Sequence, residues 1–303
     1  MRTQPSDWIT TGVFWESNRP VLAVADQSGN SRSLPVDPSR QLALDFGTPR
    51  RCIGWWLPQT QRRQPCPLSN EMPLPGPSAQ CDSCSAADPG RAFARGDVLD
   101  DGRAHALYLA WFGPQLLKVG TTALDRGSNR LAEQGAVAYV WVATGSLPGI
   151  RHLEQRVSAA TIAPQRRRRA EKVAAWWSVG SAEERASELI KAHRLIRDTL
   201  PAGTTTPHEP VVHDNLARFG LASLPHHYDE LTALAAEATV TGTVIVACGR
   251  DLLINLVDAG PTLVDSRLLA GRPTLPSSSQ RTRGITADAR TQPRSPHADE
   301  TLF

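Results

Sequence analysis

Four cysteines are the residues whose type and spacing point most directly to chemistry. They fall within 33 residues of an otherwise cysteine-poor chain, and the last two form a C-x-x-C pair. Two residues between thiolates allow both sulfurs to bind one ion, and a closed tetrahedron of four thiolates is typical of structural zinc. The predicted ligands of one structural zinc ion are Cys52, Cys66, Cys81 and Cys84.

Two alternatives to zinc remain open for this cluster. A redox C-x-x-C normally follows a strand and begins a helix, whereas Cys81 and Cys84 follow a Pro-rich loop. Four unrelated buried cysteines are the other alternative. Cys52 and Cys66 are singletons, so the spacing is looser than in a standard zinc ribbon. The fifth cysteine, Cys248, lies in the apolar stretch "TVIVACG" and is expected in the core.

A second group of candidate residues lies in and after the stretch "LYLAWFGPQLLKVGTT", residues 107–122. Its two short apolar runs around a turn predict a β-hairpin carrying Tyr108 and Lys118. The following segments predict a short helix, a strand at 136–145, a helix with Ile150, Leu153 and Val157 inward, and two further helices. The expected order of elements is therefore β-β-α-β-α-α.

This order, with these residues in it, resembles the GIY-YIG endonuclease superfamily over about residues 104–178. "ALY" at 106–108 and "KVG" at 118–120 stand at the two signature tripeptides, "RLAEQ" at the helix arginine and "HLEQRV" at the metal-binding glutamate. Lysine in the second signature and a basic, Trp-containing end are similar to a phage-related subgroup. The whole chain looks like a bacterial family that carries this core behind a Cys-rich zinc module. The resemblance implies catalytic roles for Tyr108, Lys118, Arg130 and Glu154, with Mg²⁺ or Mn²⁺ at Glu154, and leaves Arg126 as an alternative arginine.

The chemistry of phosphodiester hydrolysis suits these residue types. Tyr108 can orient or deprotonate a water molecule, and Arg130 can contact two phosphoryl oxygens at once. Glu154 offers hard oxygens for Mg²⁺, and Lys118 adds a point charge. Structural roles are the alternative: Arg130 and Glu133 can pair on one helix, and Glu154 can pair with a neighbouring arginine, Arg151 or Arg156.

A basic run follows these candidates. Residues 103–200 hold 15 Lys and Arg against 8 Asp and Glu, a net charge of +7, whereas the whole chain carries +3. Local positive charge is the electrostatic footprint of a polyanion partner. We expect Trp176 and Trp177 in the core. The predicted nucleic-acid-binding residues are Arg166, Arg167, Arg168, Arg169 and Lys172, with DNA and RNA both open.

The rest of the chain predicts an α+β protein. A β-rich module with the zinc site is expected over 1–99 and a GIY-YIG-like domain over 100–200. Residues 201–272 predict a helix at "YDELTALAAEA" followed by a small sheet that could pair with the N-terminal strands. From residue 273 to 303 the sequence is rich in Ser, Thr, Pro and Arg and predicts disorder.

Three functions fit this organisation. The first is a metal-dependent nucleic-acid phosphodiester hydrolase. The second is a non-catalytic, zinc-containing nucleic-acid-binding or adaptor protein on a degenerate core. The third is a zinc-stabilised partner-binding protein with no nucleic-acid role. The N-terminus lacks a signal-peptide core and no apolar stretch is long enough for a bilayer, so we expect a cytoplasmic protein without a membrane partner. The sequence leaves the oligomeric state open.

Overall fold

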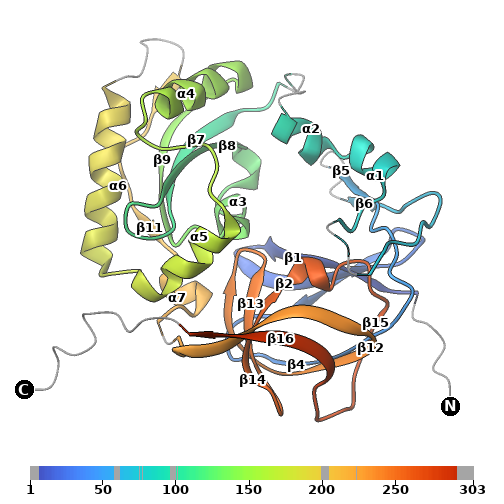
Figure 1. The fold of residues 1–303 in the computed structure, drawn as a ribbon. Helices are drawn as coiled ribbons and strands as arrows, with labels where there is room; N and C mark the ends of the chain where they lie inside the picture. Colours follow the sequence, from blue (N-terminus) through green and yellow to red (C-terminus); the bar gives the residue numbers. More distant parts are fainter. Residues whose placement is uncertain are drawn as a thin grey trace, which may run out of the picture. The chain divides into compact units, whose positions relative to one another are not determined.

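The chain is a mixed α+β protein in which strands predominate (Figure 1). It divides into two compact units, one of residues 1–98 with 227–291 and the other beginning at residue 99 and running to 226. No helix of the described residues is long and apolar enough to cross a membrane. The structure, a computed structural model, describes residues 7–57, 62–74, 76, 78–95, 100, 102–198, 205–222 and 224–291.

The unit of residues 99–226 is built on one sheet with the strand order β10-β9-β7-β8, and β11 also pairs with β9. The predicted hairpin is present, because β7 pairs antiparallel with β8. The sequence interpretation placed residue 201 onward in a separate C-terminal element, but β10 and β11 pair with β9 and so belong to this sheet. The strands are β7 (His105–Trp111), β8 (Leu117–Ala123), β9 (Ala138–Gly145), β10 (Thr205–Pro207) and β11 (His213–Asp214).

Helices pack on this sheet where the sequence predicts them. The helix α4 begins at an N-cap serine, Ser146, and buries Leu147, Ile150, Leu153 and Val157. The helix α6 begins at a capping box formed by a serine and a glutamate, and it lies against β9 and β7 (Figure 1). The helices are α3 (Asn129–Glu133), α4 (Leu147–Ala159), α5 (Arg169–Ala174), α6 (Ala182–Arg197) and α7 (Leu216–Phe219), with 3-10 turns η1 (Leu124–Arg126) and η2 (Ala175–Ser178).

The other unit combines residues 1–98 with residues 227–291. Its three-stranded sheet has the order β1-β2-β3, and its six-stranded sheet has the order β13-β14-β12-β4-β15, with β16 paired to β12. The pairing of β12 with β4 is the N- to C-terminal strand pairing considered from the sequence. Strands are β1 (Ile9–Glu16), β2 (Arg19–Ala25), β3 (Ser31–Pro35), β4 (Gln41–Phe46), β12 (His227–Cys248), β13 (Asp251–Leu256), β14 (Gly260–Asp265), β15 (Thr274–Pro276) and β16 (Arg283–Thr291), with the 3-10 turn η3 (Ser266–Leu268).

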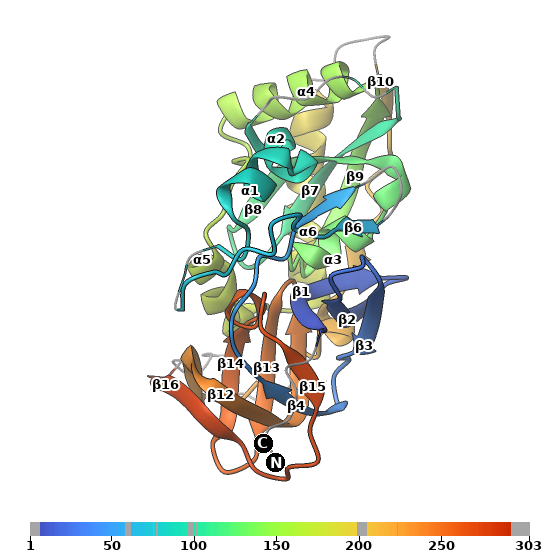
Figure 2. The ribbon, with the colours of Figure 1, turned by 90° about the vertical axis from the view of Figure 1, so that its right-hand side faces the viewer.

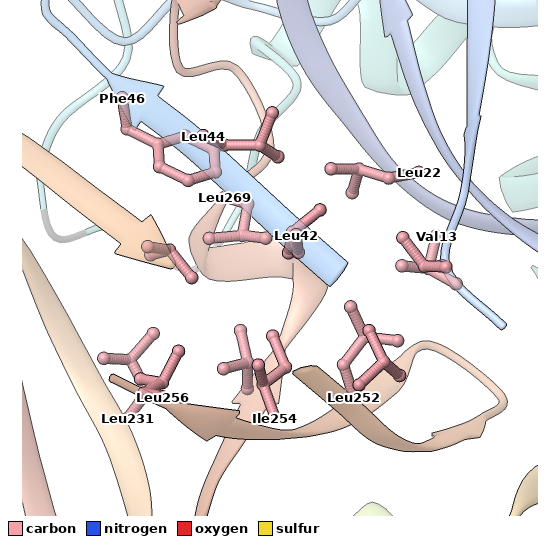
Figure 3. Close-up of a cluster of buried hydrophobic side chains, with 14 of the residues drawn as sticks. Val13, Leu22, Leu42, Leu44, Phe46, Leu231, Leu252, Ile254, Leu256 and Leu269 are labelled. Atoms are coloured by element: carbon pink, nitrogen blue, oxygen red, sulfur yellow. The ribbon is translucent and has the colours of Figure 1, made fainter. Parts of the chain in front are cut away.

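The apolar core of this unit lies between these strands. The alternating residues of β4, which the sequence predicts on one face, are all buried: Leu42, Leu44 and Phe46. Figure 3 shows them pointing toward Leu231 from β12 and Ile254 from β13. The alternation of a strand buries every second residue, so this pattern fixes the register of β4 against β12.

The predicted helix at residues 228–238 is wrong, because these residues belong to the long strand β12. Its Ala, Leu and Glu residues have high helix propensity, but β14 and β16 both pair with this stretch. Tertiary pairing of the backbone on both sides overrides the local preference of these residues.

The predicted disorder from residue 273 is wrong up to residue 291. Residues 274–276 form β15 against β4, and residues 283–291 form β16 against β12. The side chains of β16 are mostly exposed, so this strand carries no apolar alternation for the sequence to reveal. The remainder of the predicted tail, residues 292–303, lies outside the described residues.

Candidate functional site

Tyr108 and Lys118 meet on one face of the β7–β8 hairpin. Tyr108 lies at the middle of β7 and is 1% exposed, on the face opposite Leu107 and Leu109. The half-buried Lys118 donates from Nζ to the Tyr108 phenol oxygen at 2.9 Å. The same ammonium lies 5.0 Å from the centre of the Tyr108 ring. The hairpin therefore holds a cation against a buried phenol.

Gly120 makes room for this contact. It is the cross-strand partner of Tyr108 and the residue two positions after Lys118, so all three share one face. A Cβ atom at Gly120 would lie 2.2 Å from the phenol oxygen of Tyr108 and 2.6 Å from Nζ of Lys118. Any side chain at this position would displace the phenol, the ammonium or both.

Gln134 is a third partner of the phenol, which the sequence analysis missed. Its Nε2 donates to the Tyr108 oxygen at 2.5 Å. The phenol oxygen therefore accepts two hydrogen bonds and keeps its own proton as a donor. Gln134 is the last residue of "RLAEQ" and caps the C-terminal end of α3. The pentapeptide "RLAEQ", on which the prediction for Arg130 rests, therefore also contains the residue that contacts Tyr108.

Glu154 lies on α4 next to the buried Leu153, and its carboxylate contacts strand β8. Thr121 donates from Oγ1 to Glu154 Oε2 at 2.8 Å. Burial raises the pKa of the Glu154 carboxyl above its usual range, while the Thr121 hydrogen bond and the positive charges of Lys118 and Arg151 oppose this rise. Lys118 therefore interacts electrostatically with Glu154 and by hydrogen bond with Tyr108.

The described ion pair of Arg130 is with Glu133, on its own helix. Its guanidinium lies 3.5 Å from the Glu133 carboxylate, one turn along α3, and its side chain is 40% exposed. Arg126, the alternative arginine, pairs with the same carboxylate at 2.6 Å and is 45% exposed. Both arginines share the Glu133 carboxylate, and the Arg130–Glu133 pair is the structural alternative considered from the sequence.

The basic residues 166–172 divide into two groups. Arg166 and Arg168 are exposed. Arg167 donates to the carbonyl of Leu117 at 2.8 Å, which places it on the edge of β8. Lys172 donates to the carbonyl of Gln134 at 2.9 Å and lies 4.0 Å from the ring centre of Phe112. Arg169 is half-buried at the start of α5.

Of the two tryptophans that the sequence predicts in the core, Trp176 is buried there, whereas Trp177 is only half-buried. Trp176 is 3% exposed. Trp177 is half-buried, and its indole N–H donates to the carbonyl of Pro225 at 2.9 Å. Trp176 is therefore closed to solvent, and the polar edge of Trp177 is held by a backbone carbonyl.

The four cysteines converge in the other unit. Cys52 and Cys66 flank a hairpin of β5 (Trp55–Leu57) and β6 (Arg62–Gln64), which brings the two singletons together. Cys81 is the N-cap of α1 (Asp82–Ala87), and Cys84 lies in its first turn. The helices α1 and α2 (Pro89–Arg95) lie beside this hairpin (Figure 2). The open end of the β5–β6 hairpin therefore supplies the sulfurs of Cys52 and Cys66, and the first turn of α1 supplies those of Cys81 and Cys84.

The geometry of the cluster fits a metal ion. All four Sγ atoms lie within 4.8 Å of one another, and Cys66 and Cys81 are 3.9 Å apart. Four sulfurs about 2.3 Å from one zinc ion are about 3.8 Å apart in a tetrahedron. Cys52, Cys66 and Cys84 are buried. The group could therefore hold a metal ion such as zinc, and Cys248 is buried outside it.

Backbone groups direct hydrogen bonds at these sulfurs. The Cys81 N–H donates to Cys52 Sγ at 3.2 Å. Burial opposes ionisation of Cys81, but hydrogen bonds from the Cys84 backbone N–H, the Asn70 side chain and the Cys84 and Cys52 thiols together outweigh it and lower the pKa of the Cys81 thiol to about 6. Burial raises the pKa of the Cys52 and Cys84 thiols. These two thiols need a nearby cation to ionise.

Arg63 supplies one fixed positive charge beside the cluster. Burial lowers the pKa of its guanidinium, and the charges of Asp88 and Cys52 act in the opposite direction. Its NH1 donates to the carbonyl of Ile53, next to Cys52, at 3.2 Å. A zinc ion with four thiolates carries a net charge of −2, so a neighbouring guanidinium stabilises it.

Comparison with known proteins identifies the family but no further relative. No curated protein and no solved structure matches the chain. Residues 77–271 match the family model described as "Protein of unknown function (DUF2797)". This span includes Cys81, Cys84, the β7–β8 hairpin and Glu154, and it begins after Cys52 and Cys66. Because the match covers more than half of the chain, the protein belongs to the DUF2797 family.

Proposed function

We propose that the protein is a metal-dependent nucleic-acid phosphodiester hydrolase built on a GIY-YIG-like core. The observation that carries the proposal is the contact of Lys118 with Tyr108 over Gly120, together with the Lys118 charge acting on Glu154. A cation and a carboxylate that can hold a metal ion are groups that phosphoryl transfer uses around one phosphate, and here a phenol positions the cation.

The exposure of each group assigns its role. Lys118 is half-buried and Tyr108 is 1% exposed, so Lys118 meets the non-bridging phosphoryl oxygens and Tyr108 holds its ammonium in place. Glu154 is the candidate ligand for Mg²⁺ or Mn²⁺, which would polarise the phosphate and activate a water molecule. Water then attacks phosphorus, the P–O bond to the leaving oxygen breaks, and that oxygen takes up a proton.

The partner of this site is a nucleic acid, DNA or RNA. Arg166 and Arg168 are the exposed members of the basic run and would contact the phosphate backbone. Arg167 and Lys172 hold backbone carbonyls of the hairpin and of Gln134, so they position the site as well as adding charge.

We also propose that the four-cysteine group binds one structural zinc ion. The support is a closed set of four sulfurs with backbone N–H donors and with Arg63 nearby. A closed set leaves no position for substrate, so the ion would stabilise the β5–β6 hairpin against α1 and take no part in hydrolysis.

A second candidate is a non-catalytic nucleic-acid-binding or adaptor protein on the same core. Two observations favour it. Arg130 and Arg126 both pair with Glu133 on the surface, so neither supplies the arginine that a cutting site would use. Tyr108 is almost fully buried, which restricts its access to a water molecule.

Incubation of the purified full-length protein with duplex DNA, single-stranded DNA and RNA tests the proposal. Each substrate is combined with Mg²⁺, with Mn²⁺ or with no added divalent metal. Hydrolysis that requires the metal supports the nuclease. Salt-sensitive binding without hydrolysis under any condition supports the adaptor. Absence of both binding and hydrolysis overturns the two together.

A further inference from the structure

Two arginines of the unit that combines residues 1–98 with residues 227–291 are buried. Arg50 is 3% exposed and Arg272 is 0% exposed. Arginine is almost never fully buried unless a carboxylate pairs with it, because removing its charge from water is costly. No carboxylate of the described part of the chain forms an ion pair with either guanidinium. These two buried positive charges therefore have no described negative counterpart.

Backbone carbonyls satisfy most of the hydrogen-bonding capacity of Arg272. Its Nε donates to Gly47 at 2.9 Å, and NH2 donates to Ala236 at 2.8 Å and also to Ala235. NH1 donates to Leu234 at 3.4 Å. The carbonyls of Leu234, Ala235 and Ala236 belong to the irregular part of β12 between Leu234 and Thr239, where the register of β12 against β16 shifts.

Arg50 is held in the same way by other loops. Its Nε donates to Ala270 at 2.8 Å, and NH1 donates to Pro73 at 3.1 Å and to Gly76 at 3.2 Å. NH2 donates to Arg267 at 3.4 Å. A guanidinium has five N–H groups, so each arginine keeps one N–H beyond these described bonds. Carbonyl dipoles fix both guanidinium groups without neutralising them.

The two arginines line one pocket. Its volume is about 530 Å³, within the range of small-molecule sites. The described lining residues other than the arginines are apolar or neutral, and none is acidic. They are Leu74, Gly76, Thr232, Ala233, Leu234, Ala236 and Leu268. The pocket therefore combines two positive charges with an apolar wall.

The charges of the two arginines also act on each other. Burial lowers the pKa of Arg50, and burial together with the charge of Arg50 lowers the pKa of Arg272. No carboxylate contributes to either change. An anion in the pocket would relieve both the burial cost and the mutual repulsion, and a pocket of low polarity strengthens this attraction.

We propose that this pocket binds a small organic anion, with its acidic head beside Arg50, attracted by the charges of Arg50 and of the fully buried Arg272, and its apolar body against Leu74, Leu234 and Leu268. The charge of two guanidinium groups without a carboxylate partner suits a carboxylate, phosphate or sulfonate head. The leucine wall suits an aliphatic or aromatic body. The site is independent of the proposed hydrolase site, because every described lining residue belongs to the other unit.

Two dyes that differ in one sulfonate test the proposal. 8-Anilinonaphthalene-1-sulfonate is an apolar anion, and N-phenyl-1-naphthylamine is its neutral counterpart. We expect one molecule of the anionic dye to bind per full-length chain, at least about tenfold more tightly than the neutral dye. Inorganic phosphate, which has no apolar body, is expected to compete only weakly. Equal affinity for the two dyes overturns the assignment of an anionic ligand. If inorganic phosphate binds as tightly as the anionic dye, the assigned role of the apolar wall in binding is wrong.

Variants locate the binding. Arg272→Met removes one charge but also four carbonyl partners, so its fold needs a check by circular dichroism. Leu74→Glu is the safer variant, because Leu74 is 42% exposed and the new carboxylate would repel the anion. The matched control is Leu275→Glu, at a residue 36% exposed in the same unit and outside the pocket. We expect dye affinity to fall at least about tenfold in Leu74→Glu only. Unchanged affinity in Leu74→Glu, or equal loss in Leu275→Glu, overturns the proposal.

Discussion

The ammonium of Lys118 lies 2.9 Å from the phenol oxygen of Tyr108, directly over Gly120. Two charged or polar groups from adjacent strands can meet this closely because the position between them has no side chain. The contact links three residues of the hairpin into one arrangement.

Gly120→Ala is expected to destabilise the unit of residues 99–226 by about 1–3 kcal/mol, as overpacking does in a filled core. The new methyl would lie 2.4 Å from Cζ of Tyr108, so the ring or the ammonium must move. Urea unfolding measures the free energy. Gly47→Ala is the control, because its new methyl would meet Pro273 at an ordinary 3.7 Å. An equal cost for both substitutions would contradict the role of Gly120.

Cys81→Ser is expected to lower the zinc content from about one ion per chain and to lower the melting temperature. Three thiolates and a hydroxyl bind zinc more weakly than four thiolates. Elemental analysis of the purified protein measures the metal. Cys248→Ser is the control, because Cys248 is a buried cysteine outside the cluster, less exposed than the half-buried Cys81. Wild-type protein that is fully folded and free of metal would contradict a structural zinc site.

Glu154 is expected to make the protein less stable as the pH rises. Burial raises its pKa in the folded state, so the folded chain binds a proton that the unfolded chain has released. Its contribution is therefore most favourable below the unfolded pKa of about 4.3 and falls as the pH rises through the folded pKa. Relative to Glu154→Gln, the wild type should lose free energy of unfolding as the pH rises above the unfolded pKa of about 4.3.

Glu183→Gln is the control for this pH dependence, measured by urea unfolding without added divalent metal. The pKa of Glu183 is lowered, chiefly by hydrogen bonds from its own backbone N–H and Ser181. Its contribution therefore has the opposite sign: it is fully present above the unfolded pKa and is lost as the pH falls through the folded pKa. A difference between wild type and Glu154→Gln that does not change with pH would mean that Glu154 is not buried in solution.

The double variant Arg166→Ala/Arg168→Ala is expected to weaken nucleic-acid binding with little loss of stability, because both side chains are exposed. Two lost phosphate contacts should reduce the slope of log Kobs against log salt by about 1 to 2. Fluorescence anisotropy at several salt concentrations measures both. Lys172→Ala is the comparison: it removes the contact with Gln134 and should also lower the melting temperature. An unchanged salt slope in the double variant would exclude this surface.

The sequence predicted the local features better than the long-range ones. The hairpin of residues 107–122 and the inward residues of α4 followed from apolar periodicity. The number and closeness of the four cysteines predicted the cluster. They did not predict how Cys52 and Cys66 come together, because the β5–β6 pairing that unites them has no characteristic cysteine spacing in the sequence. Strand β12 was hidden because its alanines and leucines favour a helix until β14 and β16 pair with it.

Side-chain partners were the part of the candidate site that the sequence could not supply. Arg130 and Gln134 lie four residues apart on one short helix, and only the fold decides which of them reaches Tyr108. The buried arginines Arg50 and Arg272 carried no sequence signal either, because arginine is normally a surface residue. Both depend on contacts between segments that are far apart in the chain.

The rate of metal-dependent cleavage by wild type and Glu154→Gln, measured beside their nucleic-acid affinities, tests the central claim most directly. The account predicts cleavage by the wild type with Mg²⁺ or Mn²⁺, and a loss of at least about 10²-fold in Glu154→Gln with affinity unchanged, because binding depends on the exposed arginines. Glu183→Gln should cleave like the wild type. Binding by the wild type without cleavage under either metal, or cleavage that Glu154→Gln retains, would contradict the account.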